Sequence, residues 1–275
     1  MIKLDFNDLC IGDLVATTGL PENIYHATGK KCVIFDDRVW PFVHNPYVIY
    51  QKELEISGIP NITVLHSDVQ FVFKSKFIQV HSSQTAQSQT ELICFFYGIH
   101  DVILHHPRLY IYEDERIETN KIVVHTTGSD RFAKGEAVVR KYHGEDSIRV
   151  MSDNAIEAIL LNYKDYKIVQ IGGLHDKPLG GHSIDLRGKL SLWQTAKEIA
   201  SSSKFIGVNS GPMHIANCYP KVEKRIMLQE FSQESLMRFQ PGDMRNFLFQ
   251  WLDPAHLYFN KYERDISFTK SYNKI

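Results

Sequence analysis

The sequence predicts an α/β protein whose C-terminal half is built on a parallel β-sheet. Three apolar runs of strand length, 122–128, 167–173 and 204–211, each end in small or polar residues. Two segments between them, 154–164 and 191–203, carry apolar residues at helical spacing. Strand and helix therefore alternate, as they do in parallel sheets with helical crossover connections.

Ligands of such sheets bind beyond the carboxyl ends of the strands, where loops lead into helices. The polar segments 125–130, 172–175 and 209–214 follow the three predicted strands. We therefore expect these segments to lie along one edge of the sheet.

The N-terminal half is less regular. It begins with a short strand, 1–6, followed by one helical stretch from Asp13 to about Thr28, in which Pro21 starts or kinks the helix. A second strand is expected at 31–37. Further β-rich runs lie at 62–65 and 71–73.

A chain of 275 residues is long enough for two domains of ordinary size. Charge density rises and apolar periodicity stops in 113–121, so we place the boundary there and expect domains at 1–118 and 119–275. The polar run 82–90 is interpreted as a mobile surface loop, with a substrate-contacting loop as the alternative.

Composition excludes several classes of function. With 31 basic and 32 acidic residues the formal net charge is −1, so nothing favours nucleic acid or an anionic membrane as the main partner. No secretory or membrane-spanning segment is recognised, and we expect a cytoplasmic protein with at most peripheral contact at the inner face of the membrane. The oligomeric state is left open.

Cysteine and histidine spacing gives no metal site. The four cysteines are far apart and are expected to be reduced, buried thiols. His100, His105 and His106 share no helical or strand face, so a solvated or interface role is favoured over metal binding. We therefore expect no metal and no cofactor.

The junction GVNSGPMHIA (207–216) places Gly211 and Pro212 between a strand and a helix. Unpaired amides at the first turn, with no side chain on Gly211, suit a phosphate or diphosphate, which Ser210 and His214 would also contact. The alternative is that Ser210 only caps the helix and that His214 is a core histidine.

A similar junction lies near the chain start, where Gly12 and Asp13 stand between a strand-like and a helix-like segment. Asp13 is either a helix cap or a carboxylate that accepts a proton from a substrate hydroxyl. No G-x-G-x-x-G follows the first strand, which argues against a dehydrogenase or epimerase.

Three motifs resemble those of the ADP-heptose:lipopolysaccharide heptosyltransferase family, glycosyltransferase family 9. The segment DLRGKLSLWQTAKEIASSSKFIGVNSGPMHIANCYPK (185–221) resembles the C-terminal signature of that family. IGDLVATTGLPENI (11–24) is similar to its N-terminal helix start, and HTTGSDRFAKG (125–135) to the polar loop that opens its second domain. The three occur in the order of the family and cover about a third of the chain.

The resemblance implies a GT-B fold of two Rossmann-like domains facing each other across a cleft, with the nucleotide sugar held mainly by the C-terminal domain. It implies inverting, metal-independent transfer of a heptose-like sugar from a nucleotide diphosphate donor, an ADP-sugar by family, to a hydroxyl of a surface glycan or lipid-linked glycan. Asp13 would be the catalytic base. The donor would be held by Thr127, Arg131, Lys134, Gly172, Gly173, Asn209, Ser210, Gly211, Pro212, Met213 and His214.

Two departures bear on donor choice rather than on reaction class. Asn209 stands where the family usually has Asp, and Gly19 where it has Pro. Asn209 gives some support to an alternative, a non-catalytic GT-B-like protein that binds a nucleotide or glycan, whereas Gly12 and Asp13 argue against it. A transferase that acts on a protein or a small molecule is the other alternative.

Overall fold

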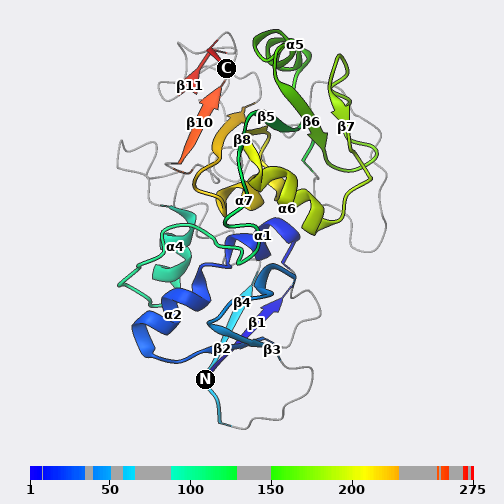
Figure 1. Cartoon of the computed structure of the whole chain (residues 1–275). Coiled ribbons are helices and arrows are strands. Elements are labelled where there is room, and N and C mark those ends of the chain that lie inside the picture. Colours follow the sequence, from blue (N-terminus) through cyan, green and yellow to red (C-terminus); the bar gives the residue numbers. More distant parts are fainter. Residues whose placement is uncertain are drawn as a thin grey trace. The chain divides into compact units, whose positions relative to one another are not determined.

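The computed structural model (Figure 1) describes residues 1–7, 9–34, 40–50, 58–65, 88–128, 150–228, 253, 255–259, 269–271 and 274–275. The chain divides into two compact units. The first comprises Met1–Glu113 with Phe249–Pro254, and the second Asp114–Leu248 with Ala255–Ile275. The division falls at the start of the charged segment 113–121 rather than between 118 and 119, and the chain returns once to the first unit.

The first unit contains a four-stranded parallel sheet in the order β3-β2-β1-β4. Its strands are short. Two helices follow β1, and a third lies shortly before the chain enters the second unit. The elements are β1 (Ile2–Asn7), α1 (Ile11–Ala16), α2 (Leu20–Thr28), β2 (Cys32–Ile34), the 3₁₀ turn η1 (Trp40–Phe42), β3 (Val48–Tyr50), β4 (Asn61–Leu65) and α4 (Gln89–Phe96).

The helical stretch predicted from Asp13 to about Thr28 is divided into two helices, and Pro21 lies in the first turn of the second, as one of its two predicted roles requires. Thr17 and Thr18 follow α1, and each hydroxyl donates to a backbone carbonyl three residues earlier at 2.7 Å. Gly19 then passes so close to α4 that a Cβ atom on it would lie 2.6 Å from Cγ2 of Thr90. Pro21 lies in the first turn of α2, where its missing N–H is no loss.

The loop predicted over 82–90 is wrong at its end. Ser88 caps α4, since its Oγ accepts from the amide of Glu91 at 3.1 Å and its own amide donates to Oε2 of Glu91 at 2.6 Å. Gln89 and Thr90 are buried rather than exposed. Residues 82–87 and the run 71–73 lie outside the described residues.

The second unit contains a seven-stranded parallel sheet in the order β11-β10-β9-β8-β5-β6-β7. The three predicted strands and two predicted helices are all present. The elements are β5 (Glu118–His125), α5 (Asp153–Asn162), β6 (Lys167–Ile171), β7 (Ile184–Asp185), α6 (Leu192–Ala200), β8 (Ser202–Gly207), α7 (Gly211–Asn217), β9 (Glu223–Met227), β10 (His256–Phe259) and β11 (Thr269–Lys270).

Alternation along β5 and β8 divides the core of this unit between the two faces of the sheet. Ile122, Val124 and Ile206 join a buried cluster that includes Ile156 and Ile159 of α5. Neighbouring residues on the same strands point to the opposite face, and there α6 and α7 contact each other and β8. Burial on both faces explains why these strands read as continuous apolar runs.

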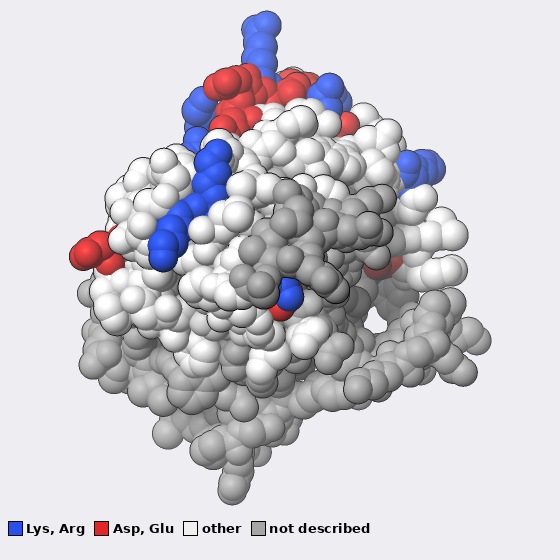
Figure 2. Space-filling view, turned by 90° about the horizontal axis from the view of Figure 1, so that it is seen from below, with Lys and Arg blue, Asp and Glu red and all other residues white. Residues whose placement is uncertain are grey.

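Acidic and basic side chains lie side by side on the face shown in Figure 2. The described part of that face therefore has no extended basic surface of the kind that binds nucleic acid phosphates. Within the described ranges, no helix has the length and apolar content needed to cross a lipid bilayer.

Candidate functional site

The candidate donor site lies where the order of strands in the second sheet reverses direction. From β5 the sheet grows through β6 on one side and through β8 on the other. His125 at the end of β5 is in register with Ile171 of β6 and with Gly207 of β8, so the three strands end at one edge. In open α/β sheets such a switch point is where ligands bind.

Ser210 lies at the turn from β8 into α7 and is bonded across the switch point. Its backbone is extended, with φ −167° and ψ 173°, and its side chain makes no cap bond to α7. The Oγ atom lies 2.9 Å from Nδ1 of His125 and 3.0 Å from the carbonyl oxygen of Val208, and its single hydrogen can point to only one of them. The predicted capping role of Ser210 is therefore wrong, because its hydroxyl is used toward β5.

His125 is bonded on its other ring nitrogen to Asp176. Nε2 lies 3.2 Å from Oδ2 of Asp176, and the same oxygen accepts from the amide of Gly173 at 2.8 Å. His125 is 4% exposed and Ser210 7%. Asp176, His125 and Ser210 thus form a continuous polar chain from the β6 loop to the start of α7.

Gly172 makes room for this chain. Its φ is +128°, and a Cβ atom there would lie 2.1 Å from Oδ2 of Asp176 and 3.0 Å from Cδ2 of His125. A side chain at 172 would therefore displace the contact between Asp176 and His125. The structure gives Gly172 and Gly173 a role in holding Asp176, next to the predicted role of contacting the donor.

Thr127 lies at the same edge, after β5, and holds the loop that follows β6. Its Oγ1 accepts from the amide of Lys177 at 2.8 Å, and the neighbouring Thr126 hydroxyl donates to the carbonyl of Lys177 at 2.5 Å. Gln170 also donates to that carbonyl, at 2.6 Å. The Lys177 ammonium pairs with Asp153 at 2.6 Å. Loop 172–179 is thus fixed to β5 by several bonds.

Helix α7 begins with Gly211 and Pro212 as the sequence predicts. It has seven residues, so its role is to place a few amides and side chains rather than to supply the dipole of a long helix. Asn209 is 6% exposed, and its Nδ2 atom has no hydrogen-bond partner within the described part of the chain. Met213 and His214 are each 1% exposed and belong to the core side of the helix.

Asp13 lies in the first unit, at the third position of α1, and is 1% exposed. Its Oδ2 accepts from the thiol of Cys10 at 2.9 Å and from the amide of Cys10 at 3.4 Å. These bonds close a capping box at the start of α1. The structure thus shows the capping role of Asp13.

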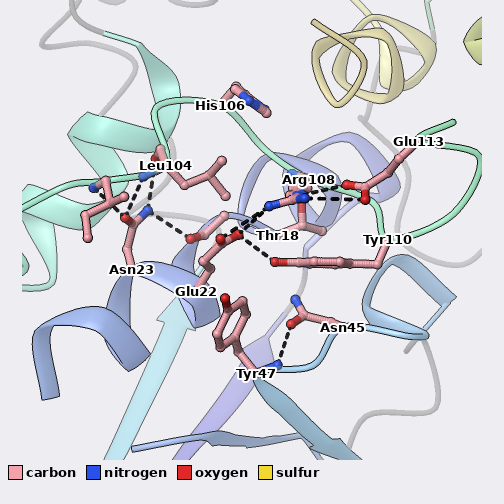
Figure 3. Close-up of polar contacts among 12 residues, drawn as sticks. Thr18, Glu22, Asn23, Asn45, Tyr47, Leu104, His106, Arg108, Tyr110 and Glu113 are labelled. Atoms are coloured by element: carbon pink, nitrogen blue, oxygen red, sulfur yellow. Dashed lines mark hydrogen bonds and ion pairs between the residues drawn. The ribbon is translucent and has the colours of Figure 1, made fainter. Parts of the chain in front are cut away.

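A second polar cluster in the first unit fixes the segment between α4 and β5 onto α2 (Figure 3). Glu22 accepts from the hydroxyl of Tyr110 at 2.5 Å and from Arg108 at 3.3 Å. Arg108 also donates to Glu113 at 2.5 Å, and its guanidinium lies over the Tyr110 ring, 4.6 Å from the centroid. Burial and the neighbouring Glu22 carboxylate raise the pKa of Tyr110 above its ordinary value.

Asn23, one residue further along α2, completes this cluster and is fully buried. Its amide nitrogen donates to the carbonyls of Gly19 and Leu104, both at 3.0 Å. Its oxygen accepts from the amides of Ile103 at 2.9 Å and Leu104 at 3.0 Å. Since these side chains bond one another and the neighbouring backbone, we assign the cluster to stability rather than to ligand binding.

The structure brings most of the predicted donor-binding residues to one edge of the second sheet. These are Thr127, Gly172, Gly173 and Asn209 to His214. Arg131 and Lys134, the predicted cations, lie outside the described residues. His125 begins one of the polar segments predicted for this edge, and Asp176 directly follows another, but the predicted set of donor-binding residues contains neither.

No three His, Cys, Asp or Glu side chains in the described ranges gather as they do around a metal ion. His105 bonds Oε1 of Glu91 through Nδ1 at 2.7 Å, and His106 lies with Nδ1 2.9 Å from the carbonyl of Pro107. His100 packs against Phe95 with ring centroids 5.6 Å apart.

Comparison with known proteins was made by family model, by sequence and by structure. No protein-family model matches the chain, and no curated protein matches it. Solved structures do match. A glycosyl transferase family 9 protein from Veillonella parvula DSM 2008 has a TM-score of 0.55 at 13% identity, over 100% of this chain and 93% of that one.

Two further solved structures have similar scores. The E. coli heptosyltransferase WaaC with ADP has a TM-score of 0.53 at 14% identity, over 100% of this chain and 97% of that one. The iron-containing dodecameric glycosyltransferase TibC from enterotoxigenic E. coli H10407 has a TM-score of 0.53 at 15% identity. It is matched over 82% of this chain and 57% of its own.

Likeness at these identities establishes the fold. The predicted class, an α/β protein of the GT-B type with two Rossmann-like units, is confirmed. The strand orders β3-β2-β1-β4 and β7-β6-β5-β8-β9-β10 repeat one doubly wound pattern in the two units. The fold is thus the one that the motif resemblance implied.

Proposed function

We propose that this protein is a glycosyltransferase that transfers a sugar from a nucleotide diphosphate donor to a hydroxyl group. One observation carries the proposal: the loops 126–127, 172–176 and 209–214 meet at the switch point of the second sheet. The first and the third belong to segments that resemble family 9 motifs, and the second follows β6 between them. The fold alone is compatible with other functions, so this convergence is the stronger support.

The donor is bound in the second unit, with its diphosphate at the β5 and β8 loops. Thr127 supplies a hydroxyl there, Gly211 permits close approach of backbone amides, Asn209 supplies an amide, and Ser210 holds the turn through its contact with His125. Arg131 or Lys134 balances the phosphate charge. Gly172 and Gly173 lie next to the nucleoside. We take the donor to be an ADP-sugar with a heptose-like sugar, because the solved heptosyltransferase WaaC carries ADP.

Transfer proceeds with inversion and without a metal ion. The acceptor oxygen forms a bond to the anomeric carbon, the bond from that carbon to the diphosphate oxygen breaks, and the electron pair leaves with the diphosphate. Asp13 takes the proton of the acceptor hydroxyl as general base. The residues around the diphosphate stabilise the charge that develops on it, as preorganised donors do in other transfer enzymes.

The acceptor is a hydroxyl of a bacterial surface glycan or lipid-linked glycan, and the reaction takes place in the cytoplasm at the inner face of the membrane. Support for this part comes from the family resemblance and not from a described contact. A protein or small-molecule acceptor is the alternative, and acceptor competition assays distinguish the three.

The test is a screen of ADP-, GDP-, UDP- and dTDP-sugars for thermal stabilisation, followed by a transfer assay. A ligand that binds only the folded protein stabilises it by about 2.7 kcal/mol at 100 times its Kd. We expect ADP-heptose to stabilise most and to be consumed when acceptor is added. Absence of stabilisation by every nucleotide sugar contradicts the proposal, and stabilisation without turnover favours a non-catalytic binding protein.

A further inference from the structure

Three polar side chains from three separate segments form one chain at the donor site. Asp176 comes from the loop after β6, His125 from the end of β5 and Ser210 from the turn after β8. The contacts are 3.2 Å between Oδ2 of Asp176 and Nε2 of His125, and 2.9 Å between Nδ1 of His125 and Oγ of Ser210. Asp176 was assigned no role in the function proposed above.

The possible hydrogen positions give Asp176 a specific effect. A carboxylate only accepts, so Nε2 of His125 carries a hydrogen whenever it bonds to Asp176. In a neutral ring Nδ1 is then an acceptor, and the hydroxyl hydrogen of Ser210 points to it. Without the carboxylate the hydrogen can move to Nδ1, which makes Ser210 the acceptor and turns its own hydrogen to the Val208 carbonyl, 3.0 Å away.

The position of Asp176 is itself fixed by the surrounding backbone. The amide of Gly173 donates to Oδ2, and the Arg187 guanidinium donates to the Asp176 carbonyl. Arg187 is held in turn by Asp185, 2.7 Å away. The absence of a side chain on Gly172 leaves the space that the carboxylate fills. A loop that only connected β6 to β7 would not require a carboxylate held by these contacts.

We propose that Asp176 is a positioning residue for the donor diphosphate. It fixes the tautomer and orientation of His125, and His125 fixes Ser210 and the turn that leads to Gly211. This inference rests on the proposed function, because it takes the group bound at that turn to be the diphosphate of a nucleotide. Asp176 acts through His125 and touches no reacting atom.

A nucleophilic role for Ser210, as in Ser-His-Asp hydrolases, fits the geometry less well. Such a serine is presented on a strained turn, whereas Ser210 has extended backbone angles of −167° and 173°. Its hydroxyl also lies 3.0 Å from the Val208 carbonyl, and the residue is 7% exposed. Labelling with a fluorophosphonate probe checks this, and we expect no covalent adduct on Ser210.

The experiment compares Asp176→Asn with wild type and with Asp165→Asn, an exposed aspartate of the same unit. Binding of ADP and of adenosine is measured by calorimetry, and the ¹⁵N spectrum of His125 reports which ring nitrogen carries hydrogen. We expect Asp176→Asn to weaken ADP binding about tenfold, the effect of weakening one hydrogen bond that holds the turn before Gly211, and adenosine binding less than twofold. The His125 hydrogen should move from Nε2 toward Nδ1, and Asp165→Asn should change none of these.

A double substitution separates positioning from general loss of structure. His125→Asn keeps a side-chain amide facing Ser210 but does not reach Asp176. In that background we expect Asp176→Asn to change ADP binding less than twofold further. An equal tenfold loss in both backgrounds, or wild-type ADP affinity and tautomer in Asp176→Asn, overturns the inference. Failure of wild type to bind any nucleoside diphosphate overturns the proposed function as well, so the two failures are told apart.

Discussion

The thiol of Cys10 lies 2.9 Å from Oδ2 of Asp13, the carboxylate that we propose as the general base. The same oxygen accepts from the Cys10 amide at 3.4 Å, so Asp13 also takes part in the cap of α1. The two roles are compatible, because a capping bond holds the carboxylate in one orientation. They are separable by substitution, since capping needs an acceptor and proton transfer needs a base.

Asp13→Asn should lower kcat by about 10² to 10⁴ while the melting temperature stays close to wild type. Asparagine keeps an oxygen for the cap but cannot take the proton of the acceptor hydroxyl. Steady-state transfer kinetics and thermal unfolding on the same samples check this. Cys10→Ser, which keeps a hydrogen-bond donor, is the matched control and should leave kcat within about threefold. Near-normal turnover of Asp13→Asn would limit Asp13 to its capping role.

Gly172→Ala should destabilise the protein by about 3 kcal/mol or more, measured by urea unfolding. An alanine here would have a strained φ of +128°, and its methyl group would lie 2.1 Å from the Asp176 carboxylate. Gly180→Ala is the matched control, because Gly180 has φ +71° and nothing lies within 4 Å of the place that its added methyl group would take. Its cost should be about 1 to 2 kcal/mol, from backbone strain alone. Equal costs at the two positions would show that the contact with Asp176 is unimportant for stability.

Asn23→Ala should cost about 2 to 4 kcal/mol of unfolding free energy. The substitution removes the side-chain partner of the buried Leu104 amide and carbonyl, of the Gly19 carbonyl and of the partly buried Ile103 amide. Asn162→Ala, which removes one exposed bond to the carbonyl of Ala158, should change stability by less than about 0.5 kcal/mol. Chemical denaturation midpoints measure both. A small effect of Asn23→Ala would mean that 103–104 is held mainly by packing.

Tyr110→Phe should change how stability depends on alkaline pH. Burial, together with the bond to Glu22, raises the pKa of Tyr110 in the folded protein above the value of about 10 in an unfolded chain. The stabilisation is therefore complete below pH 10 and is lost as pH rises toward the folded pKa. We expect the free energy of unfolding of Tyr110→Phe to be about 1 kcal/mol below that of wild type at pH 7, a figure already reduced for partial exposure. The difference between the two proteins should narrow above pH 10. Tyr166→Phe is the matched control for the loss of a tyrosine hydroxyl and should change the free energy of unfolding at pH 7 by less than about 0.5 kcal/mol.

Alkylation of the native protein at pH 8 should modify Cys10 and leave the other three cysteines unmodified. Burial raises the pKa of Cys32 and of Cys94 to about 12, so both thiols stay protonated and out of reach of the reagent. Cys218 is also buried, whereas Cys10 is partly exposed. Mass spectrometry after iodoacetamide treatment identifies the labelled sites, with denatured protein as the control. Early labelling of Cys32 would indicate that β2 opens in the native state.

Three strands and two helices of the second unit were predictable because their signals are local. β5, β6 and β8 are apolar runs that end at Gly or a polar turn, and α5 and α6 have a clear apolar face. β7 has two residues, too few to show any periodicity. The sequence analysis therefore identified β5, β6, β8 and the helices α5 and α6, and it missed β7, β9, β10 and β11.

The errors in the first unit have a non-local cause. The break between α1 and α2 has a local marker in Pro21, but it also involves the approach of Gly19 to Thr90, which is 71 positions away in the sequence. The burial of Gln89 likewise depends on other segments, since its amide bonds Asp253 at 3.4 Å. Neither contact leaves a pattern in the neighbouring residues.

The candidate site shows the same division. The junctions at Gly211 and Gly172 were predicted because Gly and Pro mark turns directly. The pairing of His125 with Asp176 depends on the order of the strands, which decides which loops are neighbours. One local signal was present: Asp176 follows Gly173 by three residues and closes a turn onto its amide.

The crowding at Gly172 also constrains the order in which related sequences can change. A side chain at 172 collides with the carboxylate at 176, so glycine must persist for as long as aspartate is kept. The reverse is not required, because loss of the carboxylate frees the space without straining the glycine. Divergent lineages should therefore include chains with glycine but no aspartate, and chains that have lost both, whereas those with aspartate and a larger residue at 172 should be absent.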